Sequence, residues 1–133
     1  MITAQYLIFA ASAIIDSVSS RLTINNIVED ILASKMPIVL PEGVIVIGFE
    51  RDLKSKSVAS IKLVVSLNDK PLGENIFDID FNEGKRNRTL AAIPPLPISE
   101  PGKLRFEIFD AKKKSLGYCE STITVNPKLD PNN

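Results

Sequence analysis

The stretch from Pro101 to Val125 restricts the fold of this chain more than any other. It is introduced by Glu100-Pro101-Gly102-Lys103, which fits a type II turn with glycine at the position that needs a positive φ. Apolar and charged side chains then alternate, with Leu104, Phe106 and Ile108 on the apolar face. A polar tip leads into a second alternating segment. This order of turn, strand, tip and strand predicts a β-hairpin with one buried face.

Period-two alternation recurs along most of the chain. Further strands are predicted over residues 4–10, 22–33, 44–49, 60–67, 75–81 and 86–93. Residues 44–49 are apolar without interruption, which is typical of a strand buried on both faces. Residues 75–81 and 86–93 flank a short polar turn and are predicted to pair as a hairpin. About eight short strands at this spacing predict an all-β fold, a two-sheet antiparallel β-sandwich with immunoglobulin-like or similar Greek-key topology.

Three segments do not follow simple period-two alternation. Residues 12–20 are predicted to be a polar, small-residue connection, which is long enough to cross from one sheet to the other. Residues 22–33 are predicted as one long strand with a bulge at Asn25-Asn26, where a tight hairpin turn is an alternative. A short helix over residues 27–33 is the other alternative, because Ile27 and Ile31 lie four positions apart. Residues 94–98 hold three prolines, which lack N–H donors, so this segment is predicted at an edge or crossing between sheets.

The chain has enough apolar sequence for one domain with its own core. It has 133 residues, of which 44% are apolar and 24% charged, which is typical of a globular protein. Aromatic residues make up only 6% and tryptophan is absent, so the predicted core is aliphatic. We expect a single domain over residues 1–126 and a disordered polar tail over residues 127–133.

Composition also weighs against several classes of function. The chain has no histidine, the commonest general base and metal ligand, so Ser-His-Asp and Cys-His catalysis are excluded and no enzymatic activity is predicted. Sixteen basic residues balance sixteen acidic ones, which gives no support for a nucleic-acid or membrane partner. Cys119 is the only cysteine, which fits a reducing compartment. The apolar run Tyr6–Ile15 is too short to span a bilayer and lacks the preceding basic residues of a signal peptide, so a cytoplasmic location is expected.

Four segments together carry a resemblance to a known family. They are the opening Ala4–Ala10, the segment Leu22–Ile27, the Pro37…Pro41 stretch and the Pro-Gly-x-x-x-Phe-x-Ile pattern that begins at Pro101. In these features the chain resembles a family of small bacterial domains of unknown function, over nearly its whole length. The resemblance implies a single-domain β-protein and brings no activity with it.

Residues 78–84 contain an acidic pattern that resembles a calcium loop. Asp78 and Asp80 stand at the first and third positions of such a loop, but Gly84 falls at the seventh position instead of the sixth, and Thr89 replaces the glutamate at the twelfth. The simpler interpretation is that the two aspartates form the solvent face of a strand. A calcium or small-ligand site over Asp78–Glu83 is the alternative function, and no cofactor is predicted. Cys119 is interpreted as a small buried hydrophobe, because it has no histidine partner.

Two surface segments are the predicted interaction surface. The first is the proline-rich stretch of Pro94, Pro95, Leu96 and Pro97, which either blocks edge-to-edge aggregation or offers a ledge to another chain. The second is the polar tip with Lys112, Lys113 and Lys114. The function predicted from sequence is therefore a non-enzymatic protein-binding or assembly module, with another protein or a second copy of the chain as partner.

Overall fold

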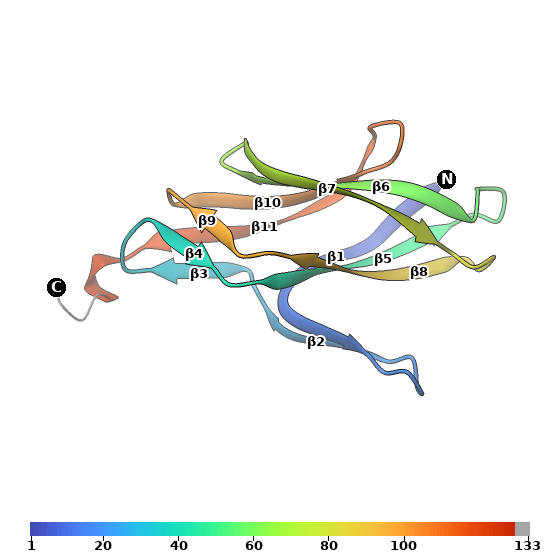
Figure 1. Ribbon diagram of the computed structural model, residues 1–133, viewed down its shortest axis with the longest axis horizontal. Coiled ribbons are helices and arrows are strands. Elements are labelled where there is room, and N and C mark those ends of the chain that lie inside the picture. Colours follow the sequence, from blue (N-terminus) through green and yellow to red (C-terminus); the bar gives the residue numbers. More distant parts are fainter. Residues whose placement is uncertain (130–133) are drawn as a thin grey trace.

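A computed structural model describes residues 1–129 (Figure 1). Eleven strands and one short 3₁₀ helix lie in this part of the chain. Their bounds are β1 (Ile2–Ile15), β2 (Leu22–Ile27), β3 (Asp30–Ala33), β4 (Ile38–Leu40), β5 (Gly43–Arg51), β6 (Val58–Leu67), β7 (Lys70–Asp80), β8 (Arg86–Ile93), β9 (Leu96–Ile98), β10 (Gly102–Phe109), β11 (Ser115–Val125) and η1 (Pro127–Leu129). The predicted all-β class is confirmed. Within the described residues, no helix has the length and apolar character needed to cross a membrane.

The strands form three sheets. Sheet A has the order β2-β1-β5-β8, sheet B has the order β3-β11-β10-β6-β7, and β4 pairs with β9 in sheet C. Every pair is antiparallel except β3 with β11, which is parallel. The structure therefore has more strands than the eight or so predicted, and a third sheet that the sequence did not predict.

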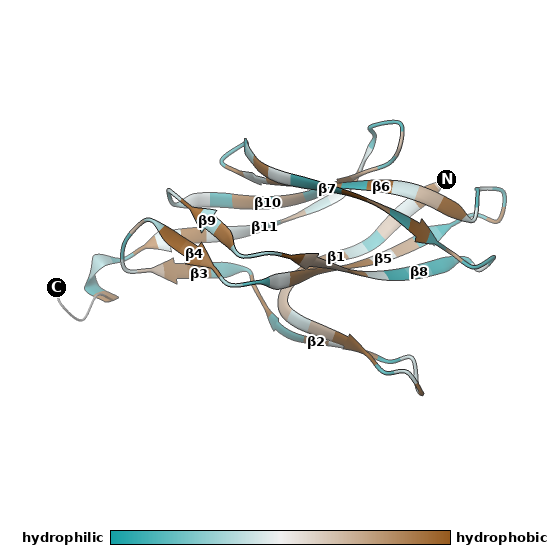
Figure 2. Cartoon of the chain, viewed as in Figure 1, coloured by the Kyte–Doolittle hydropathy of each residue, from teal (hydrophilic) through white to brown (hydrophobic). Residues whose placement is uncertain are grey.

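Sheets A and B share one apolar core. Its members come from both sheets and from the small sheet C, and most of them are aliphatic, as the composition predicts. The rings of Phe9 on β1 and Phe106 on β10 meet across the two sheets, with centroids 4.5 Å apart. At one end of the core, sheet C contributes the buried side chains of Leu40, Leu96 and Ile98, and Figure 2 shows the hydrophobic colour of β4 there.

The hairpin predicted over residues 101–125 is confirmed as β10 and β11, and the side chains predicted to be buried are buried. Leu104, Phe106 and Ile108 have no exposed surface. Gly102 has the positive φ that the turn predicts, at 140°. A Cβ at this position would also lie 1.9 Å from the side-chain oxygen of Asn68. Asn68 itself holds the turn, because its amide donates to Pro101 O and its side-chain oxygen accepts from Lys103 N–H, both at 2.9 Å.

One of the two inner strands of sheet A is β5, and it is buried on both faces as predicted. Ile45, Val46 and Ile47 have no exposed surface. Ile45 and Ile47 join the core between the sheets, whereas Val46 faces the other side of sheet A. On that side the ring of Tyr6 covers Gly48, where a Cβ would lie 2.2 Å from the ring. The glycine is thus needed for close approach, not for its φ angle.

The connection predicted over residues 12–20 is shorter than expected and does not cross between the sheets. β1 continues to Ile15 and pairs with β2 in an antiparallel hairpin. In Figure 1 this hairpin bends away from the rest of β1 and runs below sheet A. At its tip the carbonyl of Ser20 accepts a 2.5 Å hydrogen bond from the guanidinium of Arg88 on β8. The tip of the hairpin therefore contacts β8 on the outer face of sheet A.

The prediction of one bulged strand over residues 22–33 is also wrong. The segment divides into β2 in sheet A and β3 in sheet B, and neither alternative, a hairpin turn or a helix, is present. Val28 lies at the crossing, where its N–H donates to Phe9 O at 2.8 Å. Its carbonyl accepts from the buried hydroxyl of Ser121 on β11 at 2.7 Å. Asn26 has the positive φ of 56° that asparagine tolerates.

The predicted hairpin of residues 75–81 and 86–93 is wrong as well. β7 pairs with β6, β8 pairs with β5, and the two strands lie in different sheets. β6 and β7 form the tight hairpin instead, through Asn68 and Asp69, whose φ angles of 49° and 67° are those of a two-residue primed turn. The chain thus passes from sheet B to sheet A through the turn after Asp80.

The C-terminal segment is described only in part. η1 covers Pro127–Leu129, and Leu129 N–H donates to Asn126 O at 3.0 Å. The disordered tail predicted over residues 127–133 therefore begins with three residues that have regular backbone structure. Residues 130–133 lie outside the described part of the chain.

Candidate functional site

The flank formed by β7 and β8 is the main candidate site, because each strand is the last of its sheet. β7 is bonded to β6 and β8 to β5, and no other strand among residues 1–129 pairs with the free edge of either. Nearly every residue of β7 from Lys70 to Ile76 is exposed. A free strand edge of this length offers a row of N–H and C=O groups to a further strand.

Opposite charges line the two free edges. On the outer face of sheet B, β7 carries Glu74, Asp78 and Asp80, and on the outer face of sheet A, β8 carries Arg86 and Arg88. Between the acidic residues lies Ile76, whose side chain is 63% exposed. Figure 2 shows β8 as hydrophilic near the turn and hydrophobic at its other end. Each edge therefore combines an apolar part with one sign of charge.

A cleft of about 330 Å³ opens between the two strands at the end away from the turn. Leu72 and Gly73 of β7 and Ile93 of β8 line it, together with Pro94 and the core residues Leu63, Val65 and Leu96. Asn75 points toward the same cleft from the inner face of β7. Along this flank the apolar core is thus covered by few side chains.

Arg51 fixes the place where β7 and β8 diverge. It is 7% exposed, and its Nε donates to Gly84 O at 2.7 Å while Nη1 donates to Ser55 O at 2.6 Å. Its guanidinium also lies 5.3 Å from the ring centroid of Phe81. Arg51 could not be recognised from the sequence, because a lone arginine at the end of an apolar strand has the same pattern whether it is buried or solvated.

The proline-rich stretch is partly buried and partly exposed. Leu96 and Ile98 of β9 are buried, so Leu96 belongs to the core and not to the predicted surface. Pro94, Pro95 and Pro97 are exposed. Pro97 lies opposite Val39 of β4 in sheet C, and the side chain of Val39 is 67% exposed. Pro94 adjoins the cleft between β7 and β8, so this part of the predicted surface joins the candidate site.

The lysine tip lies apart from the prolines. Lys112, Lys113 and Lys114 are exposed at the β10–β11 turn, and the strand β10 separates them from β9, a length of roughly 25 Å. The carboxylate of Asp110 organises this turn by accepting from the N–H groups of Lys112 and Lys114, both at 2.9 Å. Lys112 and Lys114 line a groove with Met1 and Lys56, not the β7–β8 flank.

The hydrogen bonds of the acidic segment Asp78–Glu83 mainly stabilise the turn between β7 and β8. Asp80 Oδ1 accepts from Asn82 N–H at 2.7 Å and from Ser57 Oγ at 3.3 Å. Asn82 and Glu83 take φ angles of 50° and 64°, and Glu83 N–H donates to Ser57 Oγ at 3.1 Å. In residues 1–129 no three Asp, Glu or Cys side chains gather in a way that could hold a metal ion.

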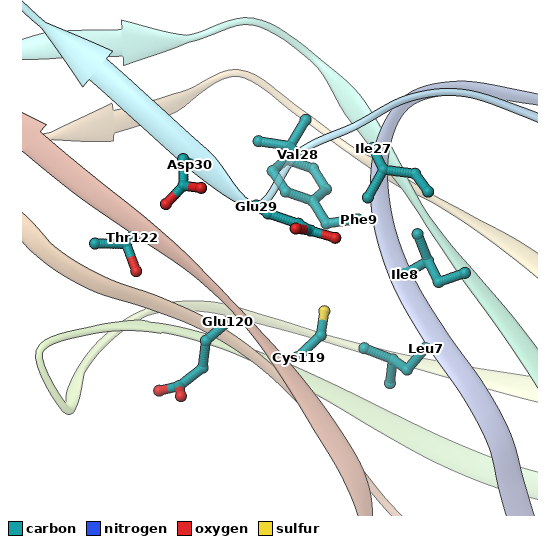
Figure 3. A pocket seen from close by; sticks show the side chains of 10 residues that line it. All are labelled: Leu7, Ile8, Phe9, Ile27, Val28, Glu29, Asp30, Cys119, Glu120 and Thr122. Atoms are coloured by element: carbon teal, nitrogen blue, oxygen red, sulfur yellow. The ribbon is translucent and has the colours of Figure 1, made fainter.

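A second pocket lies where β1 and β11 face each other, and it contains Cys119 (Figure 3). Leu7, Ile8 and Phe9 line one side, and the acidic side chains of Glu29, Asp30 and Glu120 line another. The pKa of the Cys119 thiol is raised to about 12, mainly by burial, with a hydrogen bond from the Phe9 backbone that lowers it and the charge of Glu120 that raises it. The thiol is therefore protonated at neutral pH and is a poor nucleophile.

No protein-family model matches the chain, and a search of curated proteins finds no sequence that is significantly similar to it. The candidate site therefore depends on the geometry of the β7–β8 flank.

Proposed function

We propose that this protein is a non-enzymatic protein-binding or assembly module, built on a β-sandwich of immunoglobulin-like or similar Greek-key type. The observation that carries the proposal is the free edge of β7, with its exposed Ile76, beside the cleft that Leu72 and Pro94 line. The sharing of one core between sheets A and B supports the sandwich.

The chemistry of the flank suits the addition of a strand. An extended segment laid along β7 would satisfy its free N–H and C=O groups, and side chains on alternate positions would reach either the outer face or the cleft. The outer face of β7 presents an isoleucine between carboxylates, which favours a partner strand with an apolar residue between cations. No observation of comparable weight favours the calcium site, because Asp80 is already bonded within its turn.

The test is the substitution Ile76→Lys. It adds a charge at the centre of the free edge, and we expect it to abolish the association of the protein with its partner, whether that partner is another protein or a second copy. Co-purification followed by light scattering measures both cases. Leu53→Lys is the matched control, because Leu53 is also 63% exposed but lies in the β5–β6 loop. An association that survives Ile76→Lys, or the lack of any association, would contradict the proposal.

A further inference from the structure

We propose that the partner of the β7–β8 flank is a second copy of this chain, in a two-fold dimer where β7 of each protomer pairs with β8 of the other. The inference rests on the proposed function, since it uses the same free edges, and adds the identity of the occupant. Sheet B of one protomer would continue into sheet A of its partner, and the reverse would hold on the other side of the axis.

Charge favours this pairing over the self-pairings in which the charged parts of the strands meet. An antiparallel pair of two β7 strands centred on Ile76 places Glu74 opposite Asp78, and a pair of two β8 strands centred on Asn87 places Arg86 opposite Arg88. Like charges directly opposite each other destabilise a sheet. The pairing of β7 with β8 instead joins an acidic edge to a basic one.

The residues match along the strands in one antiparallel register. In it Asp80 faces Arg86, Asp78 faces Arg88, and Ile76 faces Leu90. All of these side chains lie on the outer faces of their sheets. Two opposite-charge pairs and one apolar pair of this kind each stabilise a strand pair. Arg88 can serve both its bond to Ser20 O and a carboxylate, because a guanidinium has five N–H donors.

A two-fold axis parallel to the strands produces this register without adjustment. Within one protomer, residues of β7 and β8 that this register would pair lie near each other at both ends. Asn87 Nδ2 donates to Asp80 O at 2.9 Å near the turn, and Gly73 and Ile93 line the same cleft at the far end. Rotation about an axis along the strands leaves these heights unchanged. It brings the partner's β8 beside β7 with the outer faces on the same side.

The flanking prolines set the limits of the pairing. Pro71 precedes Gly73 on β7, and Pro94 follows Ile93 on β8. Since proline has no N–H donor, each ladder is confined to residues 73–80 of one strand and 86–93 of the other. The dimer would cover the cleft and Leu72 on both protomers. It is closed at this flank, because the two-fold axis pairs the free edges of both β7 and β8, and a closed two-fold contact does not extend into a filament.

The first experiment is a charge exchange followed by sedimentation velocity on the full chain. We expect the wild-type protein to sediment with twice the mass of the 14.6 kDa chain. Asp78→Arg and Arg88→Asp, each alone, place like charges opposite each other twice per dimer, so each should raise the dissociation constant about ten- to a hundredfold. The double variant Asp78→Arg with Arg88→Asp restores both pairs and should restore the dimer. Lys113→Glu, at the β10–β11 tip, is the control and should leave the mass unchanged.

The second experiment tests the register with cysteines, in a background that carries Cys119→Ala. A mixture of an Ile76→Cys chain and a Leu90→Cys chain should form a disulfide on mild oxidation, because directly opposed residues in adjacent strands lie within reach of one. The Ile76→Cys chain alone should not form one.

The outcomes separate this inference from the proposed function. A monomeric wild-type protein, or a dimer that ignores the charge exchange, would overturn the inference. If another protein then binds and is lost in Ile76→Lys, the proposed function stands with a different partner. If nothing binds, both are wrong.

Discussion

At the scale of single residues, packing decides what a side chain can do. Cys119 follows a glycine and a tyrosine in an alternating strand, and nothing in that pattern states its reactivity. The structure places it against Phe9 and beside Glu120 at the junction of β1 and β11. Burial and the neighbouring carboxylate both oppose the thiolate. The interpretation of Cys119 as an unreactive thiol thus gains a physical cause that the sequence could not supply.

We expect iodoacetamide to alkylate Cys119 at pH 8 at least about tenfold more slowly in the folded protein than in the unfolded chain, because only the thiolate reacts. The pKa of the thiol rises from 9.0 to about 12, so between these values the unfolded chain loses a proton that the folded protein keeps. The contribution of this group to stability is therefore complete below about pH 9 and is lost as the pH rises toward 12. Denaturant unfolding across this range, compared with Cys119→Ala, measures it. Equal alkylation rates in the two states would contradict the assignment.

Among the strands, the wrong predictions of pairing have one cause. Alternation shows that residues form a strand, but it does not show which strand lies beside it. Residues 75–81 and 86–93 have similar lengths, charges of opposite sign and a turn between them. They nevertheless belong to different sheets. The segment 22–33 similarly divides at Val28 between sheets A and B. In both cases a long-range hydrogen bond lies where the chain changes sheets, from buried Arg51 in the first and from Ser121 in the second.

Ser121→Ala tests whether the Ser121 hydroxyl stabilises the crossing from β2 to β3. Ser121 is 1% exposed, and its hydroxyl is bonded to the carbonyl of Val28. Removing the hydroxyl should lower the free energy of unfolding by about 1–3 kcal/mol, since it leaves a carbonyl without this donor. Ser66→Ala, on the outer face of β6, is the matched control and should change stability by less than about 0.5 kcal/mol. Urea unfolding of both variants measures the difference, and equal losses would show that the bond does not hold the crossing.

At the scale of the whole molecule, the two large sheets depend on each other through the core. Phe106 fills the centre of it, with no exposed surface and with its ring against Phe9 of the other sheet. Its neighbour in sequence, Arg105, lies on the outer face of sheet B. There it bonds to Glu120 at 3.2 Å and lies 4.2 Å from the ring centroid of Tyr118. Alternate residues of β10 thus stabilise the molecule in different ways.

Phe106→Ala should lower the free energy of unfolding by about 3–5 kcal/mol, because it leaves a cavity between the sheets. From sequence alone, Arg105→Ala would change stability by no more than about 0.5 kcal/mol, as is usual for a solvated residue. The contacts with Glu120 and Tyr118 raise this expectation, but the loss should stay well below that of Phe106→Ala. Thermal or urea unfolding of the two variants provides the test. Similar losses in both would mean that the inner and outer faces of β10 are assigned wrongly.

Local sequence patterns are enough to predict the all-β class, the β10–β11 hairpin, the inner face of β10 and the burial of β5 on both faces. Each of these depends on alternation and turn chemistry, which a strand carries within its own residues. Long-range packing, in contrast, separates β7 from β8, pairs the end of β1 with β2, and buries Leu96. These features depend on contacts between residues far apart in the chain, such as Arg51 with Gly84 and Arg88 with Ser20. The free edges of β7 and β8, where we propose that a second copy binds, are the product of that separation.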